Sequence, residues 1–304
     1  MINHLISIIG PTAIGKTSLS ISVAKYFDAE IISADSRQFY KEMRIGTAVP
    51  SKAELDAVKH HFIQHKSVLE PYSVGQFERD ALVKLEELFS KHPIAVMVGG
   101  SGLYLKAVTA GLNEFPDVDP TVRSKLNEKW QSEGLDSLQK QLKTLDPKTY
   151  EQIAVDNPHR VIRALEICIG TGKPYSSFLK TEIKSRPFRT LTIGLTAERQ
   201  LIYDRINERV DMMMNQGLLQ EAKALHPFKA YNALNTVGYK ELFAFLENSC
   251  DLSEAVSEIK KNTRRFAKRQ LTWFNKDDSI KWFDFDEPFE NIVDYLENEI
   301  KKPA

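Results

Sequence analysis

The stretch Gly10-Pro11-Thr12-Ala13-Ile14-Gly15-Lys16-Thr17 follows directly on the apolar run Leu5–Ile9. It has the pattern G-x-x-x-x-G-K-T at the end of a predicted strand, and apolar spacing predicts a helix after it. Glycines let backbone N–H groups wrap around an anion, while a helix beginning near Lys16 directs its positive end there. The stretch therefore predicts a phosphate-binding loop. Lys16 adds a charge, and the Thr17 hydroxyl is the expected ligand of a phosphate-bound Mg²⁺.

The whole composition is that of a globular protein. The chain has 304 residues, of which 42% are hydrophobic and 27% charged, and its 41 basic and 41 acidic side chains cancel. Nucleic-acid binding would therefore need local basic patches. Cys168 and Cys250 lie too far apart to indicate a zinc site or a disulfide framework. The chain runs straight into its first strand and has no apolar run of membrane-spanning length. We expect a cytoplasmic protein without a membrane partner.

Apolar runs alternate with amphipathic stretches, which predicts an α/β fold: a P-loop NTPase-like parallel sheet flanked by helices. The predicted strands are Leu5–Ile9, Glu30–Ser33, His61–Ile63, Ile94–Val98 and Arg189–Leu195, and the predicted helices include Lys16–Phe27 and Val74–Ser90. From Phe115 the pattern becomes helical and charge-rich. We predict a helical insertion domain over residues 116–186, within a core made of residues 1–115 and 187–304. After Thr196 we expect mostly helix.

A basic segment near the C-terminus, Ile259–Lys276, contains no acidic residue. On a helix, its basic side chains would share one face, with apolar side chains towards the other. The basic face is expected to comprise Lys261, Arg264, Arg265 and Lys268, and the apolar face Ile259, Phe266 and Trp273. Such a helix suits docking on the core and contact with a phosphate backbone, but it equally suits an ordinary solvated surface.

A carboxylate follows the second predicted strand. An ATPase or GTPase would carry an acid at the end of an apolar strand to hold Mg²⁺. The run Ile94–Val98 instead ends in Gly99-Gly100-Ser101-Gly102, whereas Asp35 comes just after Glu30–Ser33. In a doubly wound sheet the carboxyl ends of neighbouring strands line one crevice, so we expect Asp35 beside the phosphate loop. It would be a Mg²⁺ partner, a general base, or simply a turn or helix-capping carboxylate.

Several further motifs, in this order, make the chain resemble the tRNA dimethylallyltransferases. After the phosphate loop come Asp35-Ser36-x-Gln38-x-Tyr40, Ile45-Gly46-Thr47-Ala48, His60-His61, Pro71-Tyr72-Ser73-Val74 and Val98-Gly99-Gly100-Ser101-Gly102-Leu103-Tyr104. They are followed by Asn157-Pro158-His159-Arg160-Val161-Ile162-Arg163-Ala164-Leu165-Glu166, Val237-Gly238-Tyr239-Lys240 and Arg269-Gln270-Leu271-Thr272-Trp273-Phe274. The resemblance extends from the first strand to about residue 275.

The resemblance implies a reaction. A dimethylallyl group would pass from dimethylallyl diphosphate to N6 of the adenosine immediately 3′ of the anticodon, in tRNAs reading codons that start with U. Lys16 and a Mg²⁺ held by Thr17 would stabilise the departing diphosphate. Asp35 would take the proton of the adenine amine. Arg209, with Arg205 as the alternative, would contact the diphosphate from a helix. Both arginines also suit an ordinary salt-bridged helix face.

The resemblance also implies tRNA contacts, because a stacked base must be extruded before it reacts. The implied residues are Asp35, Ser36, Arg37, Gln38, Ser101, Arg123, His159, Arg160, Val161, Ile162 and Arg163. The last five suit an amphipathic structural helix as well. His60 and His61 are expected to be structural. We expect a monomer.

Three other functions remain open. A small-molecule kinase also has a phosphate loop and a helical lid. An adenylate isopentenyltransferase would modify free AMP, ADP or ATP, although it has less need of the insertion and the basic helix. A non-catalytic RNA-binding P-loop protein would leave Asp35 without a purpose.

Overall fold

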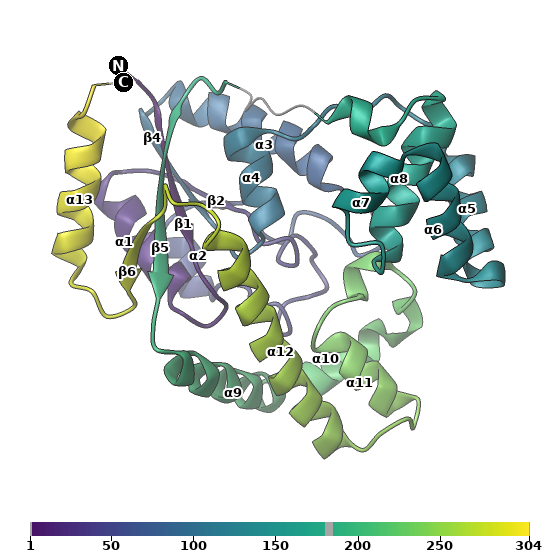
Figure 1. Ribbon diagram of the computed structural model, residues 1–304. Helices are drawn as coiled ribbons and strands as arrows, with labels where there is room; N and C mark the ends of the chain where they lie inside the picture. Colours follow the sequence, from purple (N-terminus) through teal and green to yellow (C-terminus); the bar gives the residue numbers. More distant parts are fainter. Residues whose placement is uncertain (1, 180–184, 304) are drawn as a thin grey trace. The chain divides into compact units, whose positions relative to one another are not determined.

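The computed structural model describes residues 2–179 and 185–303, and its described residues form one parallel six-stranded sheet (Figure 1). The strands are β1 (His4–Ile9), β2 (Ile31–Ser33), β3 (His60–His61), β4 (Ile94–Val98), β5 (Arg189–Thr196) and β6 (Lys281–Asp284), in the order β3-β2-β4-β1-β5-β6. Strand β1 lies between β4 and β5, with Ile6 opposite Val96 and Leu191. This confirms the predicted fold class.

The central strand is buried on both faces, as expected of a parallel sheet covered by helices. Every residue of β1 is buried. Leu5 and Ile9 belong to one apolar cluster, while Ile6 and Ile8 belong to another. This alternation follows from the two-residue period of a strand, which sends successive side chains to opposite faces. The two clusters are the cores on the two sides of the sheet.

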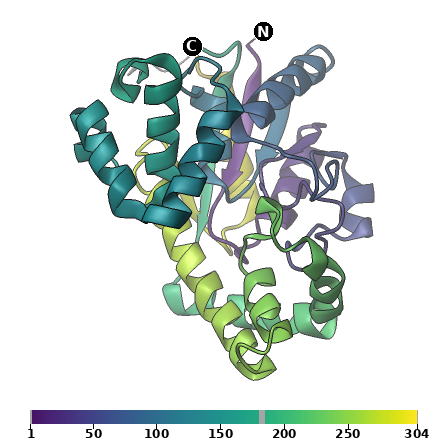
Figure 2. The ribbon, with the colours of Figure 1, turned by 90° about the vertical axis from the view of Figure 1, so that its right-hand side faces the viewer.

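The described residues divide into two compact units, 2–110 with 185–303 and 111–179. The helices of the first unit are α1 (Lys16–Tyr26), α2 (Lys52–Ala57), α3 (Val74–Phe89), α4 (Gly102–Ala110), α9 (Arg199–Asn215), α10 (Leu218–Leu225), α11 (Tyr239–Leu246), α12 (Leu252–Phe274) and α13 (Phe289–Lys301). Helix α12 lies against α4, α9 and α11, and Figure 2 shows it beside α10 and α11. No helix in either described stretch is long and apolar enough to cross a membrane.

The second unit is helical and has a core of its own. It comprises α5 (Pro120–Glu133), α6 (Leu135–Leu145), α7 (Pro147–Gln152) and α8 (Pro158–Thr171). Buried side chains of α5, α6 and α8, including Leu126, Leu138 and Leu165, form one apolar cluster. The buried Asp146 carboxylate accepts hydrogen bonds from Thr149 and from Ser176, fixing the return of the chain past α8.

Two features of the core differ from the sequence-based expectation. Strand β4 lies between β1 and β2, so Asp35 follows a strand that is not adjacent to the phosphate-loop strand. The sixth strand, β6, falls in the region where the sequence predicted mostly helix and no strand was assigned. It has four residues, of which Lys281 and Asp284 are exposed, so it offers too short a pattern to recognise. Its place in the sheet comes from pairing with β5.

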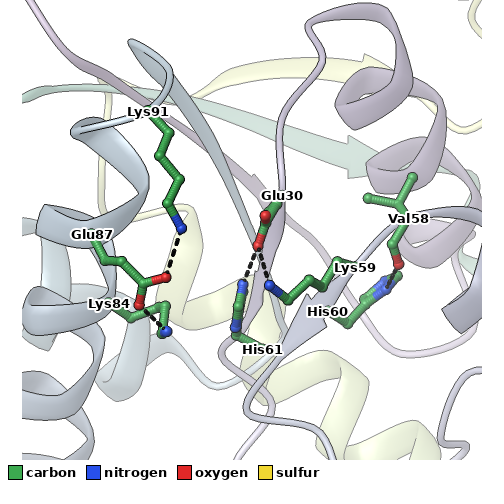
Figure 3. A network of polar contacts seen from close by, with 8 residues as sticks. All are labelled: Glu30, Val58, Lys59, His60, His61, Lys84, Glu87 and Lys91. Atoms are coloured by element: carbon green, nitrogen blue, oxygen red, sulfur yellow. Dashed lines mark hydrogen bonds and ion pairs between the residues drawn. The ribbon is translucent and has the colours of Figure 1, made fainter.

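His60 and His61 form β3 at the edge of the sheet, where they pair with Ile31 and Ile32 of β2. His61 Nε2 lies 2.5 Å from a Glu30 carboxylate oxygen, which also pairs with Lys59 at 3.3 Å (Figure 3). His60 Nδ1 lies 2.8 Å from the Val58 carbonyl oxygen. Burial lowers the pKa of both imidazoles. The geometry agrees with a structural role, as the sequence predicted.

These histidines predict a pH dependence of stability. Burial lowers the pKa of His4, His60, His61 and His65 below the ordinary value of 6.5, and neither ring nitrogen of His65 has a hydrogen-bond partner among the residues that the structure describes. The unfolded chain therefore binds more protons just below pH 6.5 than the folded chain does. The free energy of unfolding should be maintained above pH 6.5 and fall as the pH drops towards about 5.

Urea unfolding at a series of pH values measures this loss. The variant His65→Phe has no proton to gain, so its loss should be smaller. If the free energy of unfolding falls equally with pH in both proteins, His65 does not contribute to the loss.

Candidate active site

The phosphate-binding stretch opens onto a cavity of about 1090 Å³ in the first unit. Residues from loops that follow β1, β2 and β4 line it, and so do side chains of α9 and α12. The carboxyl ends of parallel strands meet at one edge of a sheet, which explains why segments so distant in sequence converge here. Asp35 and Lys16 therefore share a cavity although β4 separates their strands.

The loop has the backbone conformation that the sequence predicted. Gly15 has φ 111° and caps α1, whose first turn contains no acidic residue. The positive end of the helix dipole is thus available to an anion. The part-buried Lys16 ammonium donates to the Pro11 carbonyl at 2.7 Å. Burial lowers its pKa to about 7, opposed by the nearby charge of Asp35 and assisted by that of Arg209. An anion in the loop would restore its charge.

The two arginines of α9 both reach this loop. Arg205 Nε donates to the Ala13 carbonyl at 2.9 Å, and its guanidinium lies over the Phe285 ring. Arg209 Nη1 donates to the Thr12 hydroxyl at 3.4 Å. Burial, followed by the charge of Arg205, lowers the pKa of Arg209. Arg205 thus supports the loop backbone, whereas Arg209 is held only by a long side-chain hydrogen bond. Neither has an acidic partner among the described residues.

The predicted contacts Asp35–Gln38 form a turn at the cavity wall. Asp35 Oδ1 accepts the Arg37 N–H at 3.0 Å, so the carboxylate does serve the turn, while Oδ2 has no hydrogen-bond partner in residues 2–179 and 185–303. Ser101 Oγ accepts the Ser36 N–H at 3.2 Å. The Gln38 amide donates to the carbonyls of Thr47 and Ala48. Turn geometry thus fixes one Asp35 oxygen and leaves the other for chemistry.

The Arg37 guanidinium is already bonded to protein backbone, unlike an arginine that is free to bind phosphate. Its guanidinium donates to the carbonyls of Asn232 and Ala233, at 3.2 and 2.9 Å. It therefore joins the turn to the loop before α11. Only its remaining N–H groups are left to bind a ligand.

Gln270 joins the phosphate loop to the loop that follows β4. No role was assigned to this buried glutamine from the sequence. Gln270 is 6% exposed. Its Oε1 accepts the Thr12 N–H at 2.9 Å and its Nε2 donates to the Gly100 carbonyl at 2.9 Å. A Cβ at Gly100 would lie 2.1 Å from Nε2, so glycine is required there. The motif around Gln270 marked the segment, but no local pattern revealed these long-range partners.

Glu221, a second residue that sequence reasoning missed, holds the loop of residues 44–50, which follows β2. The Glu221 carboxylate, on α10, accepts the N–H groups of Arg44, Ile45 and Gly46 at 2.8–3.0 Å. It also accepts the hydroxyl of the buried Tyr239 at 2.6 Å. Burial and this carboxylate raise the pKa of Tyr239. The same loop, residues 44–50, lines the cavity. Glu221 thus fixes one cavity wall.

The other predicted tRNA contacts belong to the helical unit. Val161 and Ile162 are buried in its apolar core, so their side chains are not available to a ligand. His159 and Arg160 are exposed at the start of α8, which Asn157 caps. Arg123 and Arg163 are part-exposed and both pair with the buried Glu166, at 3.2 and 2.9 Å.

Helix α12 differs from the expected arrangement of its faces. Its buried side chains are Ala255, Ile259, Ala267, Gln270 and Phe274. Phe266 and Trp273 are 39% and 42% exposed, so the prediction that they dock on the core was wrong. Ile259, Phe266 and Trp273 are spaced seven residues apart and so share one face of the helix, and all three line the cavity. The face that was expected to dock on the core therefore borders the cavity. Arg264 donates to Asn207 on α9 at 2.6 Å.

Comparison with known proteins agrees with this arrangement. The family model described as IPP transferase matches residues 38–277. The chain belongs to the IPP transferase family. It is 65% identical over 300 residues to a tRNA dimethylallyltransferase of Christiangramia forsetii and 53% identical over 304 residues to one of Flavobacterium johnsoniae. These alignments cover 99% of each chain in the first case and 98% in the second.

Solved structures agree with the family. The tRNA isopentenylpyrophosphate transferase of Bacillus halodurans has a TM-score of 0.72 at 39% identity, over 98% of this chain and 95% of that one. A eukaryotic dimethylallyltransferase acting on tRNA has a TM-score of 0.81 at 26% identity, over 99% and 81%. The chain is therefore a prenyl-transferring enzyme of the tRNA dimethylallyltransferase type, and the resemblance inferred from its motifs is confirmed.

Gln270 yields a prediction about anion binding. Gln270→Met keeps the volume but leaves the Thr12 N–H and the Gly100 carbonyl without partners, so we expect inorganic diphosphate to bind about tenfold more weakly, about 1.4 kcal/mol. Gln270→Glu should bind less well at high pH and recover towards wild type as the pH falls, because only a protonated carboxyl donates to Gly100. Calorimetric titration across pH measures both.

The matched control is Gln200→Met, a glutamine bonded to Asp204 on the exposed surface of α9, which should bind diphosphate normally. Wild-type affinity for diphosphate in Gln270→Met would show that the hydrogen bonds of Gln270 do not contribute to anion binding.

Glu221 yields a prediction about stability. Glu221→Gln places an amide donor against backbone donors, so the free energy of unfolding should fall by about 3 kcal/mol. Glu247→Gln is the control, since its carboxylate pairs only with surface groups of Lys229 and His226 and should cost less than about 1 kcal/mol. Equal losses of unfolding free energy in the two variants would contradict the role of Glu221 in holding this loop.

Proposed function

We propose that this enzyme transfers the dimethylallyl group of dimethylallyl diphosphate to N6 of the adenosine immediately 3′ of the anticodon, in tRNAs that read codons starting with U. One observation carries the proposal: Asp35, whose second carboxylate oxygen accepts no hydrogen bond from the described residues, lines the same cavity as the phosphate loop. Diphosphate departure and proton removal from the amine can then take place in one space. Because the proposed substrate is a tRNA, we expect the enzyme to act in the cytoplasm, and to act as a monomer.

The loop and α9 provide the donor site. Breaking the allylic C–O bond places negative charge on the departing diphosphate, and preorganised donors there lower the barrier most. The backbone N–H groups of Gly10–Thr17, the Lys16 ammonium and the Arg209 guanidinium supply such donors. Lys16, with a pKa of about 7, gains its proton most readily when the diphosphate arrives.

The donor set also fits Mg²⁺ bound with the diphosphate. The described part of the chain holds no cluster of three His, Cys, Asp or Glu side chains arranged for a metal. Mg²⁺ on phosphates needs only one or two protein ligands, however, because phosphate oxygens and waters complete its shell. Thr17 would be the direct ligand, and Asp35 the nearby acid that lines the same cavity. When bound, Mg²⁺ neutralises charge on the leaving group.

Asp35 serves the acceptor. An exocyclic adenine amine is a weak nucleophile and loses a proton as the C–N bond forms. Asp35 Oδ2 accepts that N6 proton, while Oδ1 stays on the Arg37 N–H and holds the carboxylate in place. The turn of Ser36, Arg37 and Gln38, together with Ser101, borders the extruded nucleotide.

The helical unit would grip the tRNA elsewhere. His159 and Arg160 are exposed at the N-terminus of the 14-residue helix α8, where the positive end of the helix dipole favours phosphate. Arg123 and Arg163 add two positive charges against one Glu166 carboxylate, leaving a net positive surface. Val161 and Ile162 support this segment from the core.

Asp35→Ala should lower prenyl transfer by about two orders of magnitude or more, because it removes the proton acceptor. Binding of diphosphate and of tRNA should change little. The assay offers labelled dimethylallyl diphosphate with Mg²⁺ to unmodified tRNA and, in parallel, to AMP.

Label in tRNA alone supports the proposed reaction. Label in AMP would instead indicate an adenylate isopentenyltransferase, and label in neither would favour a kinase. Near-normal transfer by Asp35→Ala with intact tRNA binding would exclude this residue as the base.

A further inference from the structure

Two large aromatic side chains of α12 stay exposed inside the cavity. Phe266 and Trp273 are seven residues apart, two helical turns, and both line the cavity that holds the phosphate loop. They are 39% and 42% exposed, although burial of such side chains ordinarily stabilises a protein by about 2–3 kcal/mol each. The helix therefore presents aromatic faces to whatever occupies this space.

The Trp273 ring has a fixed neighbour. A Cβ built on Gly102 would lie 2.2 Å from Nε1 and 2.3 Å from Cδ1 of the indole. The ring thus lies directly against the backbone of Gly102, the residue after Ser101, and no other residue type fits there. Gln270, one turn earlier, anchors the same helix to the phosphate loop. The aromatic face is consequently held at a set position relative to the donor site.

Arg269 adds a positive charge to this face. Its guanidinium lies over the Phe266 ring at 5.8 Å and has no acidic partner in the described residues. The charged side chains lining the cavity are Lys16, Arg37, Arg44, Arg205, Arg209 and Arg269 against Asp35 and Glu54. The excess of positive charge is larger than one diphosphate in the loop requires, so it complements a polyanion that enters the cavity as well.

We propose that Phe266, Arg269 and Trp273 form a stacking platform for an unpaired RNA nucleotide adjacent to the target base. The inference rests on the proposed function, since it names where the same substrate binds. A base has flat faces that stack on aromatic rings and polar edges that stay in water, and its phosphate pairs with arginine. A five-carbon prenyl chain, in contrast, gains from full enclosure in apolar surroundings, and rings this exposed beside a guanidinium do not enclose it.

The test compares variants that separate stacking from apolar contact. Trp273→Phe keeps an aromatic face, whereas Trp273→Leu keeps apolar surface without one. Phe228→Leu is the matched control, because Phe228 is 38% exposed and lies outside the cavity lining. Each protein is titrated with an unmodified anticodon stem-loop RNA by fluorescence anisotropy, and with dimethylallyl diphosphate in the transfer assay.

We expect Trp273→Leu to bind the RNA about tenfold more weakly, while Trp273→Phe and Phe228→Leu stay within about twofold of wild type. The KM for dimethylallyl diphosphate should not change in any of them. Arg269→Gln should lower the slope of log affinity against log salt by about one.

Unchanged RNA affinity in Trp273→Leu, with wild-type transfer to tRNA intact, would overturn the platform and leave the proposed function standing. A raised KM for the donor with unchanged RNA affinity would also overturn it, and would assign the face to the prenyl group. If wild type transfers no label to tRNA, the proposed function fails, and the platform falls with it.

Discussion

The active-site region depends on positive charge that the fold buries without matching negative charge. Lys16, Arg205 and Arg209 meet at one loop, and Asp35 is the nearby carboxylate. Burial and mutual repulsion lower the pKa of Lys16 to about 7 and depress that of Arg209. A charge that is costly to hold without a counter-ion becomes favourable when an anion neutralises it. The loop is therefore organised for a diphosphate before one binds.

Such a site needs rigid support, because the same repulsion would otherwise move its parts away. The support comes from polar side chains with several backbone partners. Gln270 joins two loops, and Glu221 holds three consecutive N–H groups of a third. A buried polar group that loses its hydrogen-bond partner costs free energy. Any movement of the loop that breaks these hydrogen bonds is therefore unfavourable. Stability and preorganisation of the site thus share the same contacts.

The sequence predicted most of what local pattern determines. The phosphate loop, the strands around it and the acid after β2 were found because glycine spacing and apolar periodicity act over a few residues. Strand β6 was missed since its four residues carry no distinct pattern, and the place of β4 between β1 and β2 depends on pairing across the chain. Gln270 lies 258 residues from Thr12, and Glu221 lies 175 residues from Gly46. Their roles exist only once the chain is folded. The faces of α12 were assigned wrongly because the apolar face that includes Phe266 and Trp273 borders a cavity, while Ala267 and Phe274, each one position further on, pack in the core.

Helix α12 then links the two substrates of the proposed reaction. Its buried Gln270 bonds to the loop that would hold the diphosphate, while Trp273, one turn later, faces the space where the nucleotide would enter. A helix is stiff over one turn, so a shift of the phosphate loop would carry the Trp273 ring with it. Transfer between a bound donor and an extruded base requires their reacting atoms within about 3.5 Å, and misplacement of about 1 Å is costly. Fixing both binding surfaces to adjacent turns of one helix is a direct way to meet that requirement.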